Sequence, residues 1–584
     1  MRASNRPWHL GNTTVRSPFR LASALKVLLD SRYNGHLSSA KAEAGFGQLL
    51  FTEGLLRSVS DGEIGAWNGR KWRSAMYQLG FITPALTSGL PQESIDPRIL
   101  SIGGGLPEID GLQFKVTASG KRLALSTSIA QMEECFLRAI LAYRVPSAIE
   151  RTHASVPFSP LRIVLKTILA LEQTGLQAAV SFEEMASLVQ FCKSEAGVSR
   201  LVGDIASYRA ERAAAANKRA FDRSFRERLL AEHGNPVKST SLDDYADVNF
   251  RYLRATGLVT RARAALCVTE EKRREVEVIV TPEDRRLEDD AYLRRLWVGE
   301  VLPTDDAGEA ASAIRRLARN LTEAGRAVDV PVVEGMQVAE LEQIRLKLEM
   351  EHRMVREEQF AVAQGAETAA INDLLLLMDR KDDRAAFYRG EAPAYLEWAV
   401  WRAFLAIDTL ANEPWQVRQF HIDADMSPIA PASSRRPDMI CEFADFVLVV
   451  EVTFTENSRQ EAAEGEPVRR HVAEVTRNNP VKPVYGLFIA PRIDTNTAET
   501  FGRGDFVLSE ERILLSIVPL TLAQFAGVFQ AGFDGPRAVG PAGIRQLLDA
   551  ALAARDRDGG RWKAAIANVV SEFITSLAMS RASA

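Results

Sequence analysis

Residues 434–453, SRRPDMICEFADFVLVVEVT, decide the fold of the carboxyl-terminal half of the chain. A proline turn places Asp438 before an apolar run that predicts a buried strand, and Glu451 lies on that strand, where burial of a carboxylate is unfavourable. A cation would offset this cost. Two carboxylates with water and a main-chain carbonyl form the hard-oxygen site that suits Mg²⁺, and such a site beside phosphate indicates phosphodiester cleavage.

The spacing within this stretch favours a metal site. Glu451 and Thr453 are two residues apart on a strand, so their side chains leave the same face, whereas Val452 points the other way and its carbonyl can face a metal ion. Asp438 lies 13 residues before Glu451, which is enough for a strand or hairpin that returns beside it. Pro437-Asp438 followed by Glu451-Val452-Thr453 resembles the outline of the PD-(D/E)XK nuclease core, an outline that is short and degenerate.

Thr453 departs from that outline, because most enzymes of the superfamily place lysine there. Threonine can hold a water molecule by hydrogen bonding, but it carries no charge to balance the charge that develops in the reaction. Either another group does this work, with Glu464, Arg470 and His471 as candidates, or the site is inactive. A different alternative is that Glu451 is a buried acid paired with an arginine.

A further acid lies on a helix that precedes this stretch. Glu397 belongs to the apolar run 393–405, which has helical spacing, and an acid in this place often contributes to metal binding in nucleases of this plan. The alternative is a residue at the rim of an apolar stripe. We predict as metal ligands Asp438, Glu451, Val452 and Glu397, and as catalytic residues Asp438, Glu451, Thr453 and Glu464.

The rest of the chain predicts a multidomain α/β protein. Apolar runs at 484–490 and 513–520 indicate further strands with helices between them, so residues 366–584 are expected to form a restriction-endonuclease-like α/β core. Residues 281–365 are strongly charged and poor in aromatic side chains, which indicates a helical linker. Residues 1–280 are mainly helical in pattern and are expected to form a DNA-recognition region with winged-helix-like subdomains.

Local charge points to the start of the chain as a DNA-binding region. Residues 1–80 hold 11 lysines and arginines against 5 acids, although the whole chain has a net charge of −4. Residues 65–82 have the pattern of a recognition helix, with a wing or loop from Thr83 onward that includes 102–105. The alternative is an ordinary amphipathic helix with a solvated basic end. The candidates for DNA contacts on this helix are Asn68, Arg70, Lys71 and Arg73.

A second segment repeats this arrangement. Residues 240–257 predict a helix, and residues 258–269 alternate as in a short β-hairpin. Several apolar positions on the helix, such as Tyr245, are expected in the core. The exposed candidates for DNA contacts on this helix are Asn249, Arg251 and Arg254.

The composition is that of a soluble globular protein. Of its residues, 46% are hydrophobic and 25% are charged. At 584 residues the chain is too long for a single hydrophobic core. The four cysteines lie far apart in the sequence, which indicates neither a zinc cluster nor a disulfide framework and fits a reduced, cytoplasmic compartment. The start lacks the apolar core of a signal peptide and no stretch is long enough to cross a bilayer, so no membrane association is expected.

Several blocks of the sequence resemble the AlwI family of type IIS restriction endonucleases, together with related nicking endonucleases. They are GNTTVR at 11–16, GRKWR at 69–73 with QLGF at 78–81, DYAD at 244–247 with NFRYLRATG at 249–257, and RPD at 436–438 through EVT at 451–453 and SRQEAAEGEPVRRH at 458–471. Because these blocks run from residue 11 to 471, the resemblance is nearly full length.

The resemblance implies a region that reads a short asymmetric DNA sequence, a helical linker, and a Mg²⁺-dependent nuclease that cuts double-stranded DNA at a fixed distance outside that sequence. It also implies a cognate DNA methyltransferase. One active site cuts one strand, so cleavage of both strands requires a second nuclease domain, from a self-dimer or a separate subunit. The alternatives are an endonuclease that nicks one strand only, and a DNA-binding protein with a degenerate nuclease domain, for which Thr453 is the main support.

Overall fold

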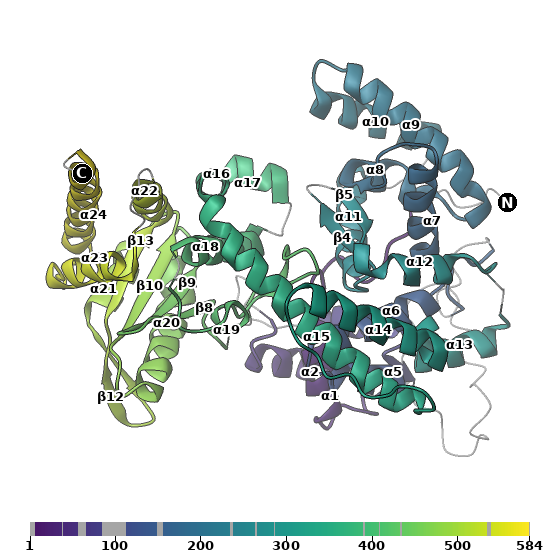
Figure 1. Ribbon diagram of the computed structural model, residues 1–584, viewed down its shortest axis with the longest axis horizontal. Helices are drawn as coiled ribbons and strands as arrows, with labels where there is room; N and C mark the ends of the chain where they lie inside the picture. Colours follow the sequence, from purple (N-terminus) through teal and green to yellow (C-terminus); the bar gives the residue numbers. More distant parts are fainter. Residues whose placement is uncertain are drawn as a thin grey trace. The chain divides into compact units, whose positions relative to one another are not determined.

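The computed structural model shows a mostly helical α/β protein with several small sheets (Figure 1). It describes residues 6–37, 39–56, 66–84, 113–148, 156–233, 238–262, 265–284, 287–388, 392–407, 409–432, 435–533 and 539–582. The chain forms two compact units. Unit 1 comprises Met1–His352 and Asp423–Asp425, and unit 2 comprises Arg353–Ile422 and Met426–Ala584.

The core of unit 2 is a four-stranded sheet. Its strands are β8 (Met439–Glu442), β9 (Val447–Val452), β10 (Val484–Ala490) and β13 (Ile517–Thr521), in the order β13-β10-β9-β8. Strand β8 is antiparallel to β9, whereas β9, β10 and β13 are parallel. Every residue of β10 is buried, as expected for a parallel strand covered on both faces.

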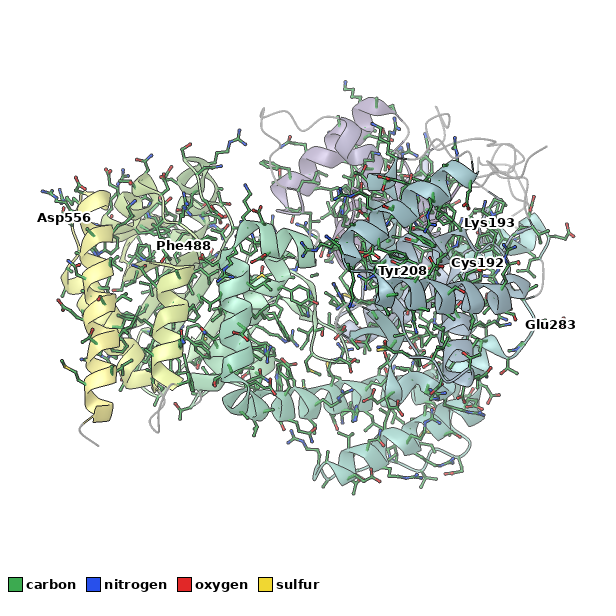
Figure 2. All side chains as sticks on the ribbon, turned by 90° about the horizontal axis from the view of Figure 1, so that it is seen from above. Cys192, Lys193, Tyr208, Glu283, Phe488 and Asp556 are labelled. Carbon is green, nitrogen blue, oxygen red and sulfur yellow. The ribbon has the colours of Figure 1, made fainter. Side chains whose placement is uncertain are left out.

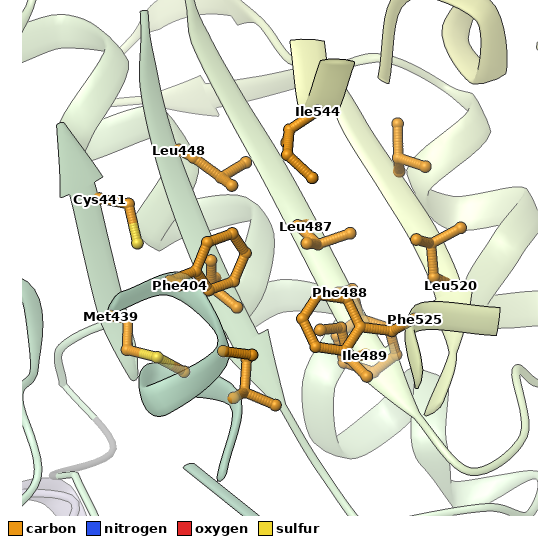
Figure 3. Close-up of a cluster of buried hydrophobic side chains, with 14 of the residues drawn as sticks. Phe404, Met439, Cys441, Leu448, Leu487, Phe488, Ile489, Leu520, Phe525 and Ile544 are labelled. Atoms are coloured by element: carbon orange, nitrogen blue, oxygen red, sulfur yellow. The ribbon is translucent and has the colours of Figure 1, made fainter. Parts of the chain in front are cut away.

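Helices cover this sheet and complete its core. The connection from β9 to β10 is α20 (Arg459–Asn478), and Val472 of α20 packs near Gly486 of β10. Phe404 of α18 (Ala392–Ile407) meets Phe525 of α22 (Leu522–Phe533), with ring centroids 5.7 Å apart. Figure 3 shows these two rings with side chains of the sheet. The other elements of unit 2 are α16 (Thr368–Asp379), α17 (Lys381–Tyr388), α19 (Pro414–Val417), β6 (His421–Ile422), β7 (Pro428–Ala430), α21 (Thr495–Gly502), β11 (Asp505–Leu508), β12 (Glu511–Leu514), α23 (Pro541–Ala553) and α24 (Gly559–Ala582).

Unit 1 contains two helices that are each followed by antiparallel strands. Helix α3 (Ala66–Gln78) leads into β1 (Ile82–Pro84), which pairs with β2 (Phe114–Val116). The predicted wing or loop between these strands falls on residues 85–112, outside the described residues. Helix α11 (Ser239–Arg254) leads into β4 (Val259–Ala262) and β5 (Ala265–Val268), and β3 (Val180–Ser181) adds a third strand to that hairpin.

Further helices surround these elements of unit 1. They are α1 (Arg20–Leu29), α2 (Ala40–Thr52), α5 (Ala118–Ala124), α6 (Ile129–Ala142), α7 (Pro160–Gln173), α8 (Phe182–Ser187), α9 (Val198–Ala214), α10 (Lys218–His233) and α12 (Arg273–Val280).

The segment predicted as a linker, 281–365, is helical, and most of it belongs to unit 1. It contains α13 (Asp289–Val298), α14 (Ala307–Glu323) and α15 (Val338–Ala363). Leu293 and Ile314 are fully buried, so these charged helices contribute apolar side chains to the core of unit 1. In the part of the chain that the structure describes, no helix is long and apolar enough to span a membrane.

Candidate active site

The structure brings Asp438 and Glu451 together on neighbouring strands. The β8–β9 register pairs Met439 with Val450, so Asp438, which directly precedes β8, lies beside Glu451 near the end of β9. The Val452 amide donates a hydrogen bond of 2.8 Å to Asp438 Oδ2. Asp438 is partly exposed and Glu451 is buried. The two carboxyl groups therefore sit at the carboxyl end of β9, one open to solvent and one enclosed.

His471 holds the buried acid from α20. Its Nδ1 lies 2.6 Å from Glu451 Oε1. Burial raises the pKa of Glu451 well above its ordinary value, and the charge of Glu464 raises it further. Burial and the nearby Arg470 charge lower the pKa of His471 to about 4, so the imidazole is neutral at pH 7. This neighbour fixes the Glu451 carboxyl group without supplying a positive charge.

Thr453 extends the pairing of strand β9, and its hydroxyl group bonds a nearby acid. The Thr453 amide donates to Ile489 O at 3.0 Å, which extends the pairing of β9 with β10. The Thr453 hydroxyl donates to Glu464 Oε1 at 2.8 Å, and the Thr455 hydroxyl lies 3.5 Å from the same oxygen. Thr453 thus positions Glu464 on α20. Thr455 is not among the residues predicted from the sequence, although its place two residues after Thr453 on an extended chain is a signal for it.

The candidates for replacing the lysine differ in what they contact. His471 contacts Glu451 and Glu464 contacts Thr453, as described above. Arg470 is partly buried and forms ion pairs on its own helix, with Glu466 at 3.2 Å and Glu474 at 3.6 Å. Its charge lowers the pKa of both Glu451 and His471, so its electrostatic influence reaches the buried acid and the histidine of the site even though its ion pairs lie elsewhere.

Glu397 binds the main chain of the segment that leads to Asp438. It lies on α18, is buried, and accepts a hydrogen bond of 2.8 Å from the Ala432 amide. Within the described ranges, no three His, Cys, Asp or Glu side chains are arranged to hold a metal ion. The predicted four-ligand set that includes Glu397 is therefore not assembled in this structure.

The donors that are assembled fit Mg²⁺. Asp438 and Glu451 offer carboxylate oxygens, and the Val452 carbonyl lies on the same strand end. Mg²⁺ commonly takes one or two carboxylates and keeps several waters, so it does not require a cage of side chains. Burial raises the pKa of Glu451, and a divalent cation bound beside it would favour the ionised carboxylate.

The DNA-binding candidates on α3 divide into exposed and buried positions. Arg70 and Lys71 are partly exposed. Arg73 is buried: its guanidinium bonds Glu43 at 2.5 Å and lies 4.9 Å from the Phe114 ring centroid. This burial contradicts the prediction that Arg73 contacts a DNA base, because the side chain joins α3 to α2. The Asn68 side chain lies outside the described residues.

The prediction that the three candidates on α11 are exposed is wrong. Asn249 is fully buried, and its Oδ1 accepts from the Leu10 amide at 2.8 Å. Arg251 is buried beside Asp247, at 3.0 Å.

Arg254 is buried as well, at the end of the same helix. Only 1% of its side chain is exposed, and it pairs with Asp423 at 2.9 Å. The reason is that α11 is enclosed by segments distant in sequence, with residues 8–16 on one side and Asp423–Asp425 at its end.

Two acids at the end of neighbouring strands of a partly parallel sheet, in a hard-oxygen arrangement, are typical of a metal-dependent nuclease. The chain belongs to the AlwI restriction endonuclease family, whose model matches residues 77–528. This membership makes it a type II deoxyribonuclease, and DNA is the substrate that the family implies.

A comparison with solved structures found similar chains. The chain is similar to the small subunit (R.BspD6I2) of the heterodimeric restriction endonuclease R.BspD6I, with 22% sequence identity over 33% of this chain and 98% of that chain, and a TM-score of 0.27. No curated protein matches the chain.

Proposed function

We propose that the chain is a type IIS restriction endonuclease that recognises a short asymmetric sequence in double-stranded DNA and hydrolyses phosphodiester bonds outside it, with Mg²⁺. The observation that carries the catalytic part is the 2.8 Å hydrogen bond from the Val452 amide to Asp438 Oδ2, because it fixes the two acids of adjacent strands side by side. Family membership supports the restriction activity.

Asp438, Glu451 and the Val452 carbonyl would hold the metal ion. When bound there, Mg²⁺ supplies Lewis-acid polarisation of the phosphoryl oxygen and a lower pKa for an attacking water. His471 keeps the Glu451 carboxyl group in one orientation through the 2.6 Å contact. Glu464, which the Thr453 hydroxyl bonds at 2.8 Å, would accept a proton from water at its other carboxylate oxygen. Glu397 fixes the approach to Asp438 from α18 and remains the candidate for a second ion.

Unit 1 would read the DNA. A helix followed by an antiparallel hairpin, as in α3 with β1 and β2 and in α11 with β4 and β5, is the arrangement of a winged helix. Arg70 and Lys71 lie in the first half of α3 and are partly exposed, and we propose them with Asn68 as the DNA contacts of this helix. Since α11 buries its polar residues, we assign it a scaffolding role for the N-terminal segment.

Asp438→Ala and Glu451→Ala test the catalytic assignment. Each should abolish cleavage of plasmid DNA in Mg²⁺ while sequence-specific binding stays at the wild-type level, because both side chains lie in unit 2. Asp445→Ala is the matched control: this exposed acid follows β8 and pairs with Arg545, so cleavage should be retained. Loss of specific binding in both catalytic variants would overturn this division of labour.

Thr453, in place of lysine, favours a second candidate, a DNA-binding protein with a degenerate nuclease domain. Nicking of supercoiled plasmid by the wild-type chain with Mg²⁺ and with EDTA separates the two. Cleavage in Mg²⁺ that EDTA stops supports the enzyme. Specific binding without cleavage at any Mg²⁺ concentration supports the binding protein. The family also implies a cognate DNA methyltransferase, which we propose as a partner in the cell.

A further inference from the structure

Helices α9 and α10 form a pair inserted between α8 and α11 of unit 1. They pack against each other and lie beside one another in Figure 1. Neither helix belongs to the helix-and-hairpin elements proposed to read DNA. One set of α10 residues contacts the rest of unit 1, and another set is exposed. The two sets have different electrostatic surroundings.

The inner face of α10 is fastened to α9. The Tyr208 hydroxyl, labelled in Figure 2, donates to Asp222 Oδ1 at 2.5 Å, and the Arg212 guanidinium bonds the same carboxylate at 2.7 and 2.9 Å. The Tyr208 ring packs on Phe225, with centroids 4.9 Å apart. Asp222 is buried, so its charge is used within the pair of helices.

A second attachment joins α10 to α8 and α11. Arg226 is buried and forms ion pairs with Glu183 of α8 and with Asp243 of α11, the latter at 2.7 Å. A buried arginine with two acidic partners holds its helix in one position, since removing either partner would leave an uncompensated charge. These ion pairs therefore hold α10 in one position against α8 and α11.

The outer face of α10 carries cations in different surroundings. Lys218, Arg219 and Arg223 are exposed. Among the residues that the structure describes, no acidic side chain pairs with any of the three. Arg219 and Arg223 are one helical turn apart, or ~6 Å along the axis. The exposed acids of this helix, Glu227 and Glu232, and the exposed Arg228, which pairs with Glu211 of α9 at 4.0 Å, lie further along the helix, so the three cations occupy its first half.

We propose that Lys218, Arg219 and Arg223 form a phosphate-contact surface for the duplex DNA substrate. Charge complementarity selects this occupant: the chain as a whole has a net charge of −4, so attraction for a polyanion must come from local clusters of cations held in fixed positions. Contacts of this kind set affinity and register without reading sequence. The proposal rests on the proposed function, because DNA is the polyanion that the enzyme must hold.

The test neutralises the three cations together, as Lys218→Ala/Arg219→Ala/Arg223→Ala. Binding to a duplex that the wild-type chain cleaves, and to a duplex of unrelated sequence, is measured between 50 and 200 mM KCl in EDTA. The plot of log affinity against log salt should become shallower by about 2 to 3 units of slope, and both duplexes should bind roughly tenfold or more weakly at low salt. Thermal unfolding should be unchanged, because the three side chains are exposed.

A matched control removes three exposed cations from other helices of unit 1, as Arg315→Ala/Arg319→Ala/Lys347→Ala. The change in net charge is the same, so wild-type binding in this control supports the proposal. A wild-type salt slope in the α10 variant, or equal losses in both variants, would overturn it. If the wild-type chain cleaves no DNA the proposed function fails, whereas normal cleavage with an unaffected α10 variant contradicts only the present inference.

Discussion

At the scale of single residues, the surroundings of Glu451 bear on how a buried carboxyl group would serve the proposed metal site. Burial raises the pKa of Glu451, and its contact with His471 comes from an imidazole whose own pKa is lowered to about 4. A neutral imidazole orients the carboxyl group and leaves its charge available to a cation. A protonated histidine or an arginine in the same place would compete with the metal ion for that charge.

His471→Ala tests this role at the residue scale. We expect the Mg²⁺ concentration for half-maximal cleavage to rise by about 10- to 100-fold, as is usual when a residue that orients a metal ligand is removed. DNA binding in EDTA should stay unchanged. Arg477→Ala, an exposed change on the same helix, is the control. A variant with wild-type Mg²⁺ dependence would show that His471 does not position Glu451.

His421 makes the free energy of unfolding depend on pH. It lies partly buried on β6, and burial, followed by the charges of Arg418, Arg353 and Arg436, lowers its pKa to about 4. The unfolded chain, with a histidine pKa of about 6.5, binds more protons between pH 6.5 and 4, so the free energy of unfolding falls as pH falls through that window.

The full shift of His421 corresponds to about 3 kcal/mol, and residual solvent access makes the measured loss smaller. The measurement is the urea midpoint at pH 7 and pH 5. His421→Gln should lose less stability than the wild-type chain between the two pH values, and His36→Gln, at an exposed histidine, should match the wild type. Equal losses in wild type and His421→Gln would contradict the assignment.

At the scale of elements, the close approach of α20 to the sheet places Glu464 and His471. This approach requires glycine at position 486 of β10. A Cβ atom there would lie 2.8 Å from Val472 Cγ2 of α20 and 2.9 Å from Ile517 Cγ1 of β13. The absence of a side chain on β10 therefore sets the distance between α20 and the strand that carries Glu451.

Gly486→Ala should consequently reduce both stability and cleavage. Crowding of a packed core typically costs about 1–3 kcal/mol, and a shift of α20 would also displace His471 from Glu451. Gly203→Ala on α9 is the control, since no atom lies within 4 Å of the added methyl group and alanine favours an exposed helix by up to about 1 kcal/mol. Unfolding free energies and cleavage rates are the measurements. Wild-type values for Gly486→Ala in both assays would refute the argument.

The elements of unit 2 were predictable where the pattern is local. The run 484–490 predicts a strand, and β10 confirms it with the same bounds. The run 513–520 predicts one strand, and this is wrong: it contains the end of β12 and most of β13, separated at Leu515, whose amide bonds Gly504 O. Hydropathy is equally high on both sides of this turn, so the break leaves no signal in the apolar pattern.

The candidate site was predictable only in part. The expectation that Asp438 returns beside Glu451 is confirmed by the strand register, and the catalytic roles stay predictions. The exposure of Asn249 and Arg254 was not predictable, because the groups that bury them, Leu10 and Asp423, lie 239 and 169 residues away in sequence. Helical periodicity identifies which residues share a face, but it does not show which distant segment covers that face.

For the whole molecule, the central question is how a chain with one predicted nuclease centre cuts a duplex. Asp438 and Glu451 contribute a single pair of acids in unit 2, and one such centre acts on one strand at a time. Cleavage of both strands then requires a second nuclease domain, supplied by another copy of the chain or by a separate subunit.

The products from supercoiled plasmid answer this question. With a self-dimer, open circles should form first and linear molecules should appear at a rate that rises with the square of protein concentration. With a separate subunit, the purified chain should yield open circles alone at every concentration. Linear DNA formed directly, without open circles and with first-order dependence on protein, would contradict one centre per chain.

The strand order of unit 2 also determines when the proposed nuclease centre can form during translation. Strands β8 and β9 can pair as a hairpin soon after they are made, whereas the parallel neighbours β10 and β13 require the segments between them to be complete. Asp438, Glu451 and Glu464 therefore leave the ribosome well before β13, whose pairing completes the sheet around Glu451. Since domains generally fold in the order of synthesis, most of unit 1 is made before the proposed nuclease centre of unit 2 can form.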